Sequence, residues 1–145
     1  MAETTQSYSN HTRWHTPFHF VLTPILLIHF IWSVVQLVRD PGWVTAEALL
    51  LSIGLLLMML LVRGNPLRAQ DRLIRLEEQL RMQRLLPAAL AARASALPVR
   101  FLVALRFAPD EELPTLVQQA LDGKFTKPDD LKRTIKNWRG DYFRV

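Results

Sequence analysis

His29, Ser33 and Gln36 are polar side chains in the second half of the first long apolar stretch, and Asp40 follows just after it. His29, Ser33, Gln36 and Asp40 are spaced by four, three and four residues, so a helix would place them in one stripe. A polar group surrounded by hydrocarbon is costly unless it finds a hydrogen-bond partner. We therefore expect His29, Ser33 and Gln36 to contact another protein or a ligand rather than lipid.

The imidazole of His29 is also suited to bind the central metal of a tetrapyrrole. Trp32, three residues on, could pack against a macrocycle. A six-coordinate haem needs a second axial ligand, and the second apolar stretch offers only Met58 and Met59. A bacteriochlorophyll magnesium needs one ligand. The alternative is a hydrogen bond from His29 to a neighbouring helix, with no cofactor required.

His11, His15 and His19 are spaced by four residues, which on a helix would align three imidazoles for zinc. Pro17 interrupts that helix, and no nearby carboxylate is present to orient the rings. We therefore expect no metal site, and favour an aromatic segment at a membrane surface or on another subunit.

Catalytic patterns are lacking. The acidic groups at 77–78, 110–112 and 129–130 are expected at helix starts or on solvated faces, where they stabilise a helix without doing chemistry. The chain has no cysteine, which excludes thiolate catalysis and disulfides. It also has no glycine-rich phosphate loop, nucleophile elbow or HExxH motif. We expect that the protein is not an enzyme.

Two apolar stretches must position these side chains. Residues 18–38 and 43–62 each approach the roughly 20 residues that cross a bilayer as a helix. A buried hairpin of a soluble protein is the alternative, but the second stretch is apolar on all sides. The Asp-Pro-Gly turn at 40–42 predicts that the two helices form an antiparallel hairpin.

Arginines predict the orientation in the membrane. Residues 63–106 hold nine arginines against three acids, and arginine beside a membrane end marks the cytoplasmic side. Both termini should therefore be cytoplasmic. Trp14, Trp43, Arg63 and Arg68 are expected at the membrane interfaces, with arginines on anionic lipid headgroups. Because the positive charge lies beside the membrane, we expect no nucleic-acid partner.

An arginine-rich helix should follow over residues 63–86. Leu73, Leu76 and Leu80 fall on one side of it and form an apolar seam that requires a partner. A solvated helix whose ion pairs, such as Glu77 with Arg81, need no partner is the alternative.

The remaining residues, 87–145, predict a small cytoplasmic helical domain. Proline and glycine divide it into four short helices, over 87–97, 98–107, 109–121 and 128–138, the third stopped by Gly123. Thr126 and Asp129 resemble a capping box for the last helix. The fold class is therefore all-α, and residues 1–17 form an N-terminal interfacial segment before the hairpin.

An aromatic and guanidinium cluster closes the chain. Such side chains are enriched at binding hot spots. The tail either binds a partner or folds back to cap the domain. Its members are Trp138, Arg139, Tyr142, Phe143 and Arg144.

Four segments resemble an uncharacterised bacterial family of small two-span membrane proteins with a domain of unknown function. They are SNHTRWHTPFHFVLTPILLIHF, LRAQDRLIRLEEQLR, LVALRFAPDEELPTLVQQAL and IKNWRGDYFRV. The resemblance covers nearly the whole chain and implies fold and location without an activity. It further implies an accessory subunit of a photosynthetic reaction centre–antenna complex.

These features predict a non-catalytic accessory subunit that stabilises a larger inner-membrane complex, photosynthetic or respiratory. One alternative is a tetrapyrrole-binding subunit that uses His29. Another is a standalone membrane-anchored adaptor for assembly or signalling.

Overall fold

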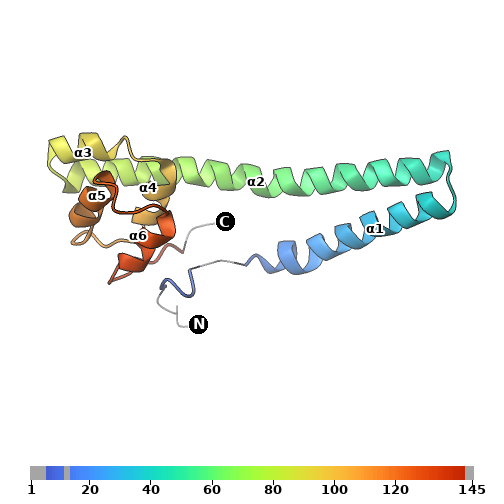
Figure 1. Cartoon of the computed structure of the whole chain (residues 1–145), viewed down its shortest axis with the longest axis horizontal. Helices are drawn as coiled ribbons and strands as arrows, with labels where there is room; N and C mark the ends of the chain where they lie inside the picture. The colour runs from blue at the N-terminus through green and yellow to red at the C-terminus, as the bar shows by residue number, and fades with distance from the viewer. Residues whose placement is uncertain (1–5, 12–13, 143–145) are drawn as a thin grey trace. The chain divides into compact units, whose positions relative to one another are not determined.

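The structure is a computed structural model that describes residues 6–11 and 14–142. Within these residues all regular structure is helical, which confirms the predicted class (Figure 1). The elements are a π-helix η1 (Pro17–Leu22) and helices α1 (Thr23–Arg39), α2 (Trp43–Leu85), α3 (Ala88–Ala94), α4 (Val99–Leu105), α5 (Leu113–Leu121) and α6 (Pro128–Thr134).

The chain divides into two compact units. Residues 13–66 form one, and residues 1–12 together with 67–145 form the other. We call the first the apolar unit and the second the small unit. The small unit therefore combines the two ends of the sequence.

The apolar unit begins with a π-helix because of Pro24. A proline has no N–H to donate, and its ring crowds the carbonyl four residues earlier, here that of Phe20. The helix widens, and Thr23 donates from both its backbone N–H and its hydroxyl to the carbonyl of Phe18, the hydroxyl at 2.8 Å. This i to i−5 register ends at Leu22, and α1 continues as a regular α-helix.

Two helical stretches are long and apolar enough to cross a membrane. They are the continuous helix Pro17–Arg39 and the N-terminal part of Trp43–Leu85. Only 6% of each apolar window is buried inside the chain, whereas a core helix of a soluble protein would be mostly buried. Apolar side chains cover the outside of both stretches.

Contacts inside the apolar unit join its two helices. The hydroxyl of Thr23 lies 3.6 Å from the Met59 sulfur, and the Arg63 guanidinium lies 5.8 Å from the Phe18 ring centroid. Each contact pairs an early residue of the first stretch with a late residue of the second. Ser33 and Ser52 are the buried polar residues of this unit.

Helix α2 does not end at the membrane-length stretch. It continues through Gly64 and Pro66 to Leu85, so one helix contains the second apolar stretch and most of the predicted arginine-rich segment. The predicted boundary at residue 63 is therefore not a break in secondary structure.

The small unit packs α3 to α6 around the C-terminal part of α2 (Figure 1). Helix α2 contributes the buried Met82 and the partly buried Leu85 to this core, and Leu86 follows directly after the helix. The four short helices that follow α2 confirm the prediction; α3, α4 and α6 end earlier than expected, whereas α5 ends at residue 121 as expected and begins later. The largest fully buried side chains of this unit are Phe107, Met82, Leu102, Leu105, Leu113, Leu131 and Val117.

Local signals set the ends of α5 and α6. After α5, Gly123 has a φ of 74°, and the Lys124 N–H donates to the Gln119 carbonyl at 3.0 Å, which completes a Schellman motif. The predicted stop at Gly123 is confirmed. At the start of α6 the Asp130 carboxylate accepts the Lys127 N–H at 3.1 Å, so the predicted capping pair is wrong by one residue.

Candidate functional site

Arg81 is the centre of a buried ionic network in the small unit. Its Nη1 donates to the Glu78 carboxylate at 3.1 Å, and its Nη2 donates to the Ala108 carbonyl at 2.7 Å. Its Nε and Nη2 both donate to Asp110 Oδ1, at 2.8 and 2.6 Å. One guanidinium thus fastens α2 to the loop between α4 and α5. The expected Glu77–Arg81 pair is replaced by Glu78 and Asp110.

The sequence suggested that Glu78 lies on a solvated face or at a helix start, and this prediction is wrong. Its exposed fraction is 4%, because α2 turns this residue toward α3 to α6. Burial raises the pKa of the Glu78 carboxyl, and the Arg81 guanidinium opposes that shift. The hydrogen bond from Arg81 instead lowers the pKa of Asp110.

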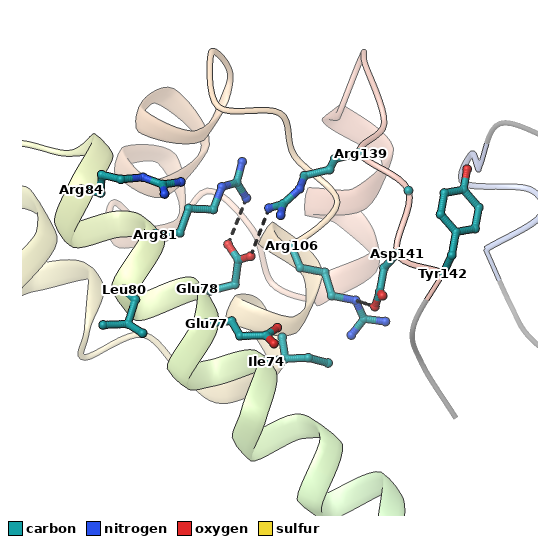
Figure 2. A pocket seen from close by; sticks show the side chains of 11 residues that line it. Ile74, Glu77, Glu78, Leu80, Arg81, Arg84, Arg106, Arg139, Asp141 and Tyr142 are labelled. Atoms are coloured by element: carbon teal, nitrogen blue, oxygen red, sulfur yellow. Dashed lines mark hydrogen bonds and ion pairs between the residues drawn. The ribbon is translucent and has the colours of Figure 1, made fainter.

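The segment after α6 lines a pocket beside this network. Figure 2 shows the Glu78 carboxylate between the guanidinium groups of Arg81 and Arg139, with Arg139 Nη1 at 3.7 Å from Glu78 Oε1. Arg106 Nε pairs with Asp141 at 3.0 Å. The pocket has a volume of about 620 Å³, and α2 contributes Ile74, Glu77, Leu80 and Arg84 to its wall. Both arginines and acidic residues line its wall, so it favours no single ligand charge.

The N-terminal segment packs on the same unit. Gln6 and Asp141 exchange two hydrogen bonds, from Gln6 Nε2 to the Asp141 carbonyl at 3.2 Å and from the Asp141 N–H to Gln6 Oε1 at 2.8 Å. The Arg139 N–H also donates to the Phe107 carbonyl at 2.8 Å. Both ends of the described chain are therefore tied to the core.

His11 is held by an aromatic cluster. Its ring centroid lies 5.5 Å from that of Tyr8, 5.9 Å from Phe107 and 5.6 Å from Trp138. Its Nδ1 is 2.7 Å from the Tyr8 carbonyl, and its Nε2 is 3.3 Å from Lys132 Nζ. Because an ammonium can only donate, these contacts fit a neutral ring with the proton on Nδ1.

The predicted polar stripe is partly covered within the apolar unit. Ser33 has an exposed fraction of 2%, and its hydroxyl donates to the His29 carbonyl at 2.8 Å. His29 and Gln36 are half-buried, and neither side chain has a hydrogen-bond partner in the described residues. Ser33 is thus satisfied by its own helix, whereas the imidazole and carboxamide are not.

The three leucines predicted to need a partner face away from the core. Leu73, Leu76 and Leu80 are exposed by 61%, 54% and 58%. The buried residues of this part of α2, such as Ile74 and Met82, lie on the other side of the helix. The part of the chain that the structure describes therefore does not cover these three leucines.

The predicted tail cluster is divided between core and surface. Trp138 is half-buried and lies 4.9 Å from Phe107 between ring centroids, so this residue folds back on the domain. Arg139 and Tyr142 are exposed and line the pocket. Phe143 and Arg144 lie outside the described residues.

The residues predicted at membrane interfaces lie on the surface. Trp14, Trp43 and Arg68 are exposed, and Arg63 is half-buried over Phe18. In residues 6–11 and 14–142, no three histidine, cysteine or acidic side chains gather as a metal site. The His19 Nδ1 lies 3.0 Å from the backbone carbonyl of His15.

The main interactions missed by the sequence are the Arg81 network, the Gln6–Asp141 pair and the His11 cluster. For the first, a signal was present. One side of α2 carries Ile74, Glu78, Arg81 and Met82 at helical spacing. This side mixes apolar and charged residues, and two short helices could cover it. The other two join residues more than 90 positions apart, for which a single sequence offers no signal.

No curated protein and no solved structure matches the chain. A protein-family model described as a family of unknown function, DUF6526, matches residues 1–145, which is the whole sequence. The chain therefore belongs to the DUF6526 family.

Proposed function

We propose that the protein is a non-catalytic accessory subunit of a larger complex in a bacterial inner membrane. Its two apolar stretches cross the membrane as a helical hairpin, and both termini are cytoplasmic. The small unit lies on the cytoplasmic side, where it contacts the host complex and anionic headgroups.

Packing within the small unit supports the hairpin. Residues 6–11 contact α6 and the segment after it, through His11 with Lys132 and Gln6 with Asp141. Segments that pack together lie on the same side of a membrane. The intervening chain must then cross an even number of times, and it holds two apolar stretches of sufficient length. The arginine excess after the second stretch makes that side the cytoplasm.

Two unsatisfied side chains carry the proposal of a companion protein. His29 and Gln36 lie in the first apolar stretch, half-buried and without a hydrogen-bond partner in the described residues. Within hydrocarbon an imidazole or a carboxamide gains about 1 kcal/mol from a bond to a neighbouring helix. A transmembrane helix of another subunit would supply such partners.

Position-specific photocrosslinking tests this function. A photoreactive residue at Gln36 should capture one specific membrane protein, identified by mass spectrometry, and the same residue at Ile28 should capture lipid, because Ile28 is exposed in the same stretch. The double substitution His29→Leu with Gln36→Leu should release that protein in mild detergent, while Ile28→Leu should not. Lipid capture at both positions, or full retention by the double variant, would contradict the proposal.

The small unit should add to the docking. Deletion of residues 136–145 removes Arg139 and Tyr142 from the pocket wall and should weaken co-purification of the companion. For the host we propose an energy-transducing complex, photosynthetic or respiratory, on the resemblance alone.

A second candidate is a tetrapyrrole-binding subunit. It is favoured by one observation: the His29 imidazole has no partner in the described residues and is free to bind a metal. The absorption spectrum of the purified chain distinguishes the two. A Soret band lost in His29→Leu would support ligation, and a band that survives the substitution would exclude His29 as the ligand.

A further inference from the structure

We propose that the exposed face of α2 over residues 69–83 is a docking surface for a second copy of this chain, as a parallel two-stranded coiled coil. We call this face the leucine seam; it consists of Ala69, Leu73, Leu76, Leu80 and Gln83.

The seam has the spacing of a coiled coil. Its residues follow one another by four, three, four and three positions, which is the a and d pattern of the heptad repeat. Leu73 and Leu80 take the a positions, and Leu76 takes a d position. Ala69 and Gln83 take the flanking d positions.

The seam is also available. Its three leucines are more than half exposed, and Ala69 and Gln83 are exposed as well. At 3.6 residues per turn, the seam lies roughly opposite the α2 residues that pack on α3 to α6, such as Glu78 and Met82. A helix could therefore pack on the seam without displacing the core of the small unit.

The charged residues beside the seam favour a second copy of the same chain as the binding partner. In a parallel coiled coil, the residue at g of one helix faces the next e residue of the other. Here g is Arg72 and the next e is Glu77, both exposed. Two symmetric Arg72–Glu77 pairs would form across the dimer. Within one helix these residues are five apart and lie on opposite edges of the seam, so they cannot pair.

The parallel sense rests on the proposed membrane insertion. Copies inserted with the same orientation present α2 in the same direction, which is the arrangement that aligns the seam with itself. The seam spans about two heptads and is short for a coiled coil in solution. Confinement of both copies to one membrane raises their effective concentration and offsets that shortness.

Cysteine crosslinking of the full-length protein in native membranes tests the arrangement. The chain has no cysteine, so one introduced thiol reports one position. Under mild oxidation Ala69→Cys should give a disulfide-linked dimer, because position 69 meets its equivalent at the N-terminal end of a parallel seam. Arg75→Cys, at an exposed position off the seam, should stay monomeric. No dimer from Ala69→Cys, or equal amounts from both variants, would overturn the proposal.

Charge exchange in the Ala69→Cys background tests the choice of partner. Arg72→Glu or Glu77→Arg alone should lower the crosslinked fraction by about three- to fivefold, as expected from the loss of two exposed ion pairs. The two substitutions together restore both pairs with reversed sign and should restore the dimer. Failure of the double variant to recover would show that the seam binds a different protein.

Failure of this inference differs from failure of the proposed function. Membrane insertion is measured separately, as resistance of the protein to alkaline extraction of the same membranes. A protein that stays in the membrane but gives no crosslink overturns only the dimer. A protein that is extracted overturns the membrane insertion on which both proposals rest.

Discussion

Arg81 and Asp110 are joined by two hydrogen bonds to a single carboxylate oxygen, from Nε at 2.8 Å and from Nη2 at 2.6 Å. They lie 29 residues apart in the sequence. The same guanidinium holds the buried Glu78 and the Ala108 carbonyl, so it connects α2 to the helices that follow. The following predictions concern this network and the contacts around it.

Arg81→Met should destabilise the small unit by about 3 kcal/mol, because it leaves the buried Glu78 carboxylate without its main partner. Urea unfolding of the full chain in mild detergent measures the effect. Trp138 reports the small unit alone once the other three tryptophans, Trp14, Trp32 and Trp43, are replaced by phenylalanine. Arg84→Met, at an exposed position nearby, should change the free energy of unfolding by less than about 0.5 kcal/mol. Equal effects would contradict a stabilising role for the network.

Glu78 and Asp110 should make opposite contributions to the pH dependence of stability. The pKa of Glu78 is raised from 4.5 by burial, so its contribution is fully present below that value and is lost as pH rises through the raised pKa. Relative to the native protein, Glu78→Gln should therefore gain stability as the pH rises above about 4.5 and through the raised pKa. A pH-independent difference would contradict the raised pKa.

Asp110 has a pKa lowered from 3.8, mainly by the hydrogen bond from Arg81. Its contribution is present above that value and is lost as pH falls through the lowered pKa. Asp110→Asn should be less stable than the native protein at neutral pH, and the difference should disappear in acid. Because Asp110 is half exposed, we expect a difference below about 1 kcal/mol. Urea titrations at each pH, with the Trp138 reporter, measure both variants.

His11→Ala should release the N-terminal segment from the small unit. The substitution removes ring contacts to Tyr8, Phe107 and Trp138 together with the hydrogen bond from Lys132. Hydrogen exchange of residues 6–11 should become faster, and Trp138 emission should shift to the red. His15→Ala is the matched control, because His15 is exposed and should leave both signals unchanged. Unchanged exchange in His11→Ala would show that other contacts hold the segment.

Gly123→Ala should destabilise the small unit by about 1 kcal/mol, because an L side chain at a φ of 74° strains the backbone. Gly123→Asn should lose less, since asparagine tolerates this conformation better. Thermal unfolding of both variants, followed at Trp138, measures the difference. Equal losses would indicate that side-chain size, and not backbone conformation, limits this position.

Features that are set by residues close together in the sequence could be predicted from the sequence. Runs of apolar residues identified the two membrane-length stretches, and Gly123 identified the end of α5. The site could not be predicted in the same way. Leu73, Leu76 and Leu80 read as the side of α2 that needs a partner, but α3 to α6 pack on the opposite side. That side holds Glu78 and Arg81, and it reads as solvated until Asp110 and the Ala108 carbonyl are brought close in space.

The two hydrogen bonds between Gln6 and Asp141 also constrain when the protein can fold. Gln6 leaves the ribosome early, and its partner is synthesised 135 residues later, after both apolar stretches have emerged. With the membrane insertion proposed above, the N-terminal segment stays unpaired on its own side of the membrane until both stretches have inserted. The small unit is then completed only after insertion, so a stalled insertion would leave His11 and Trp138 apart.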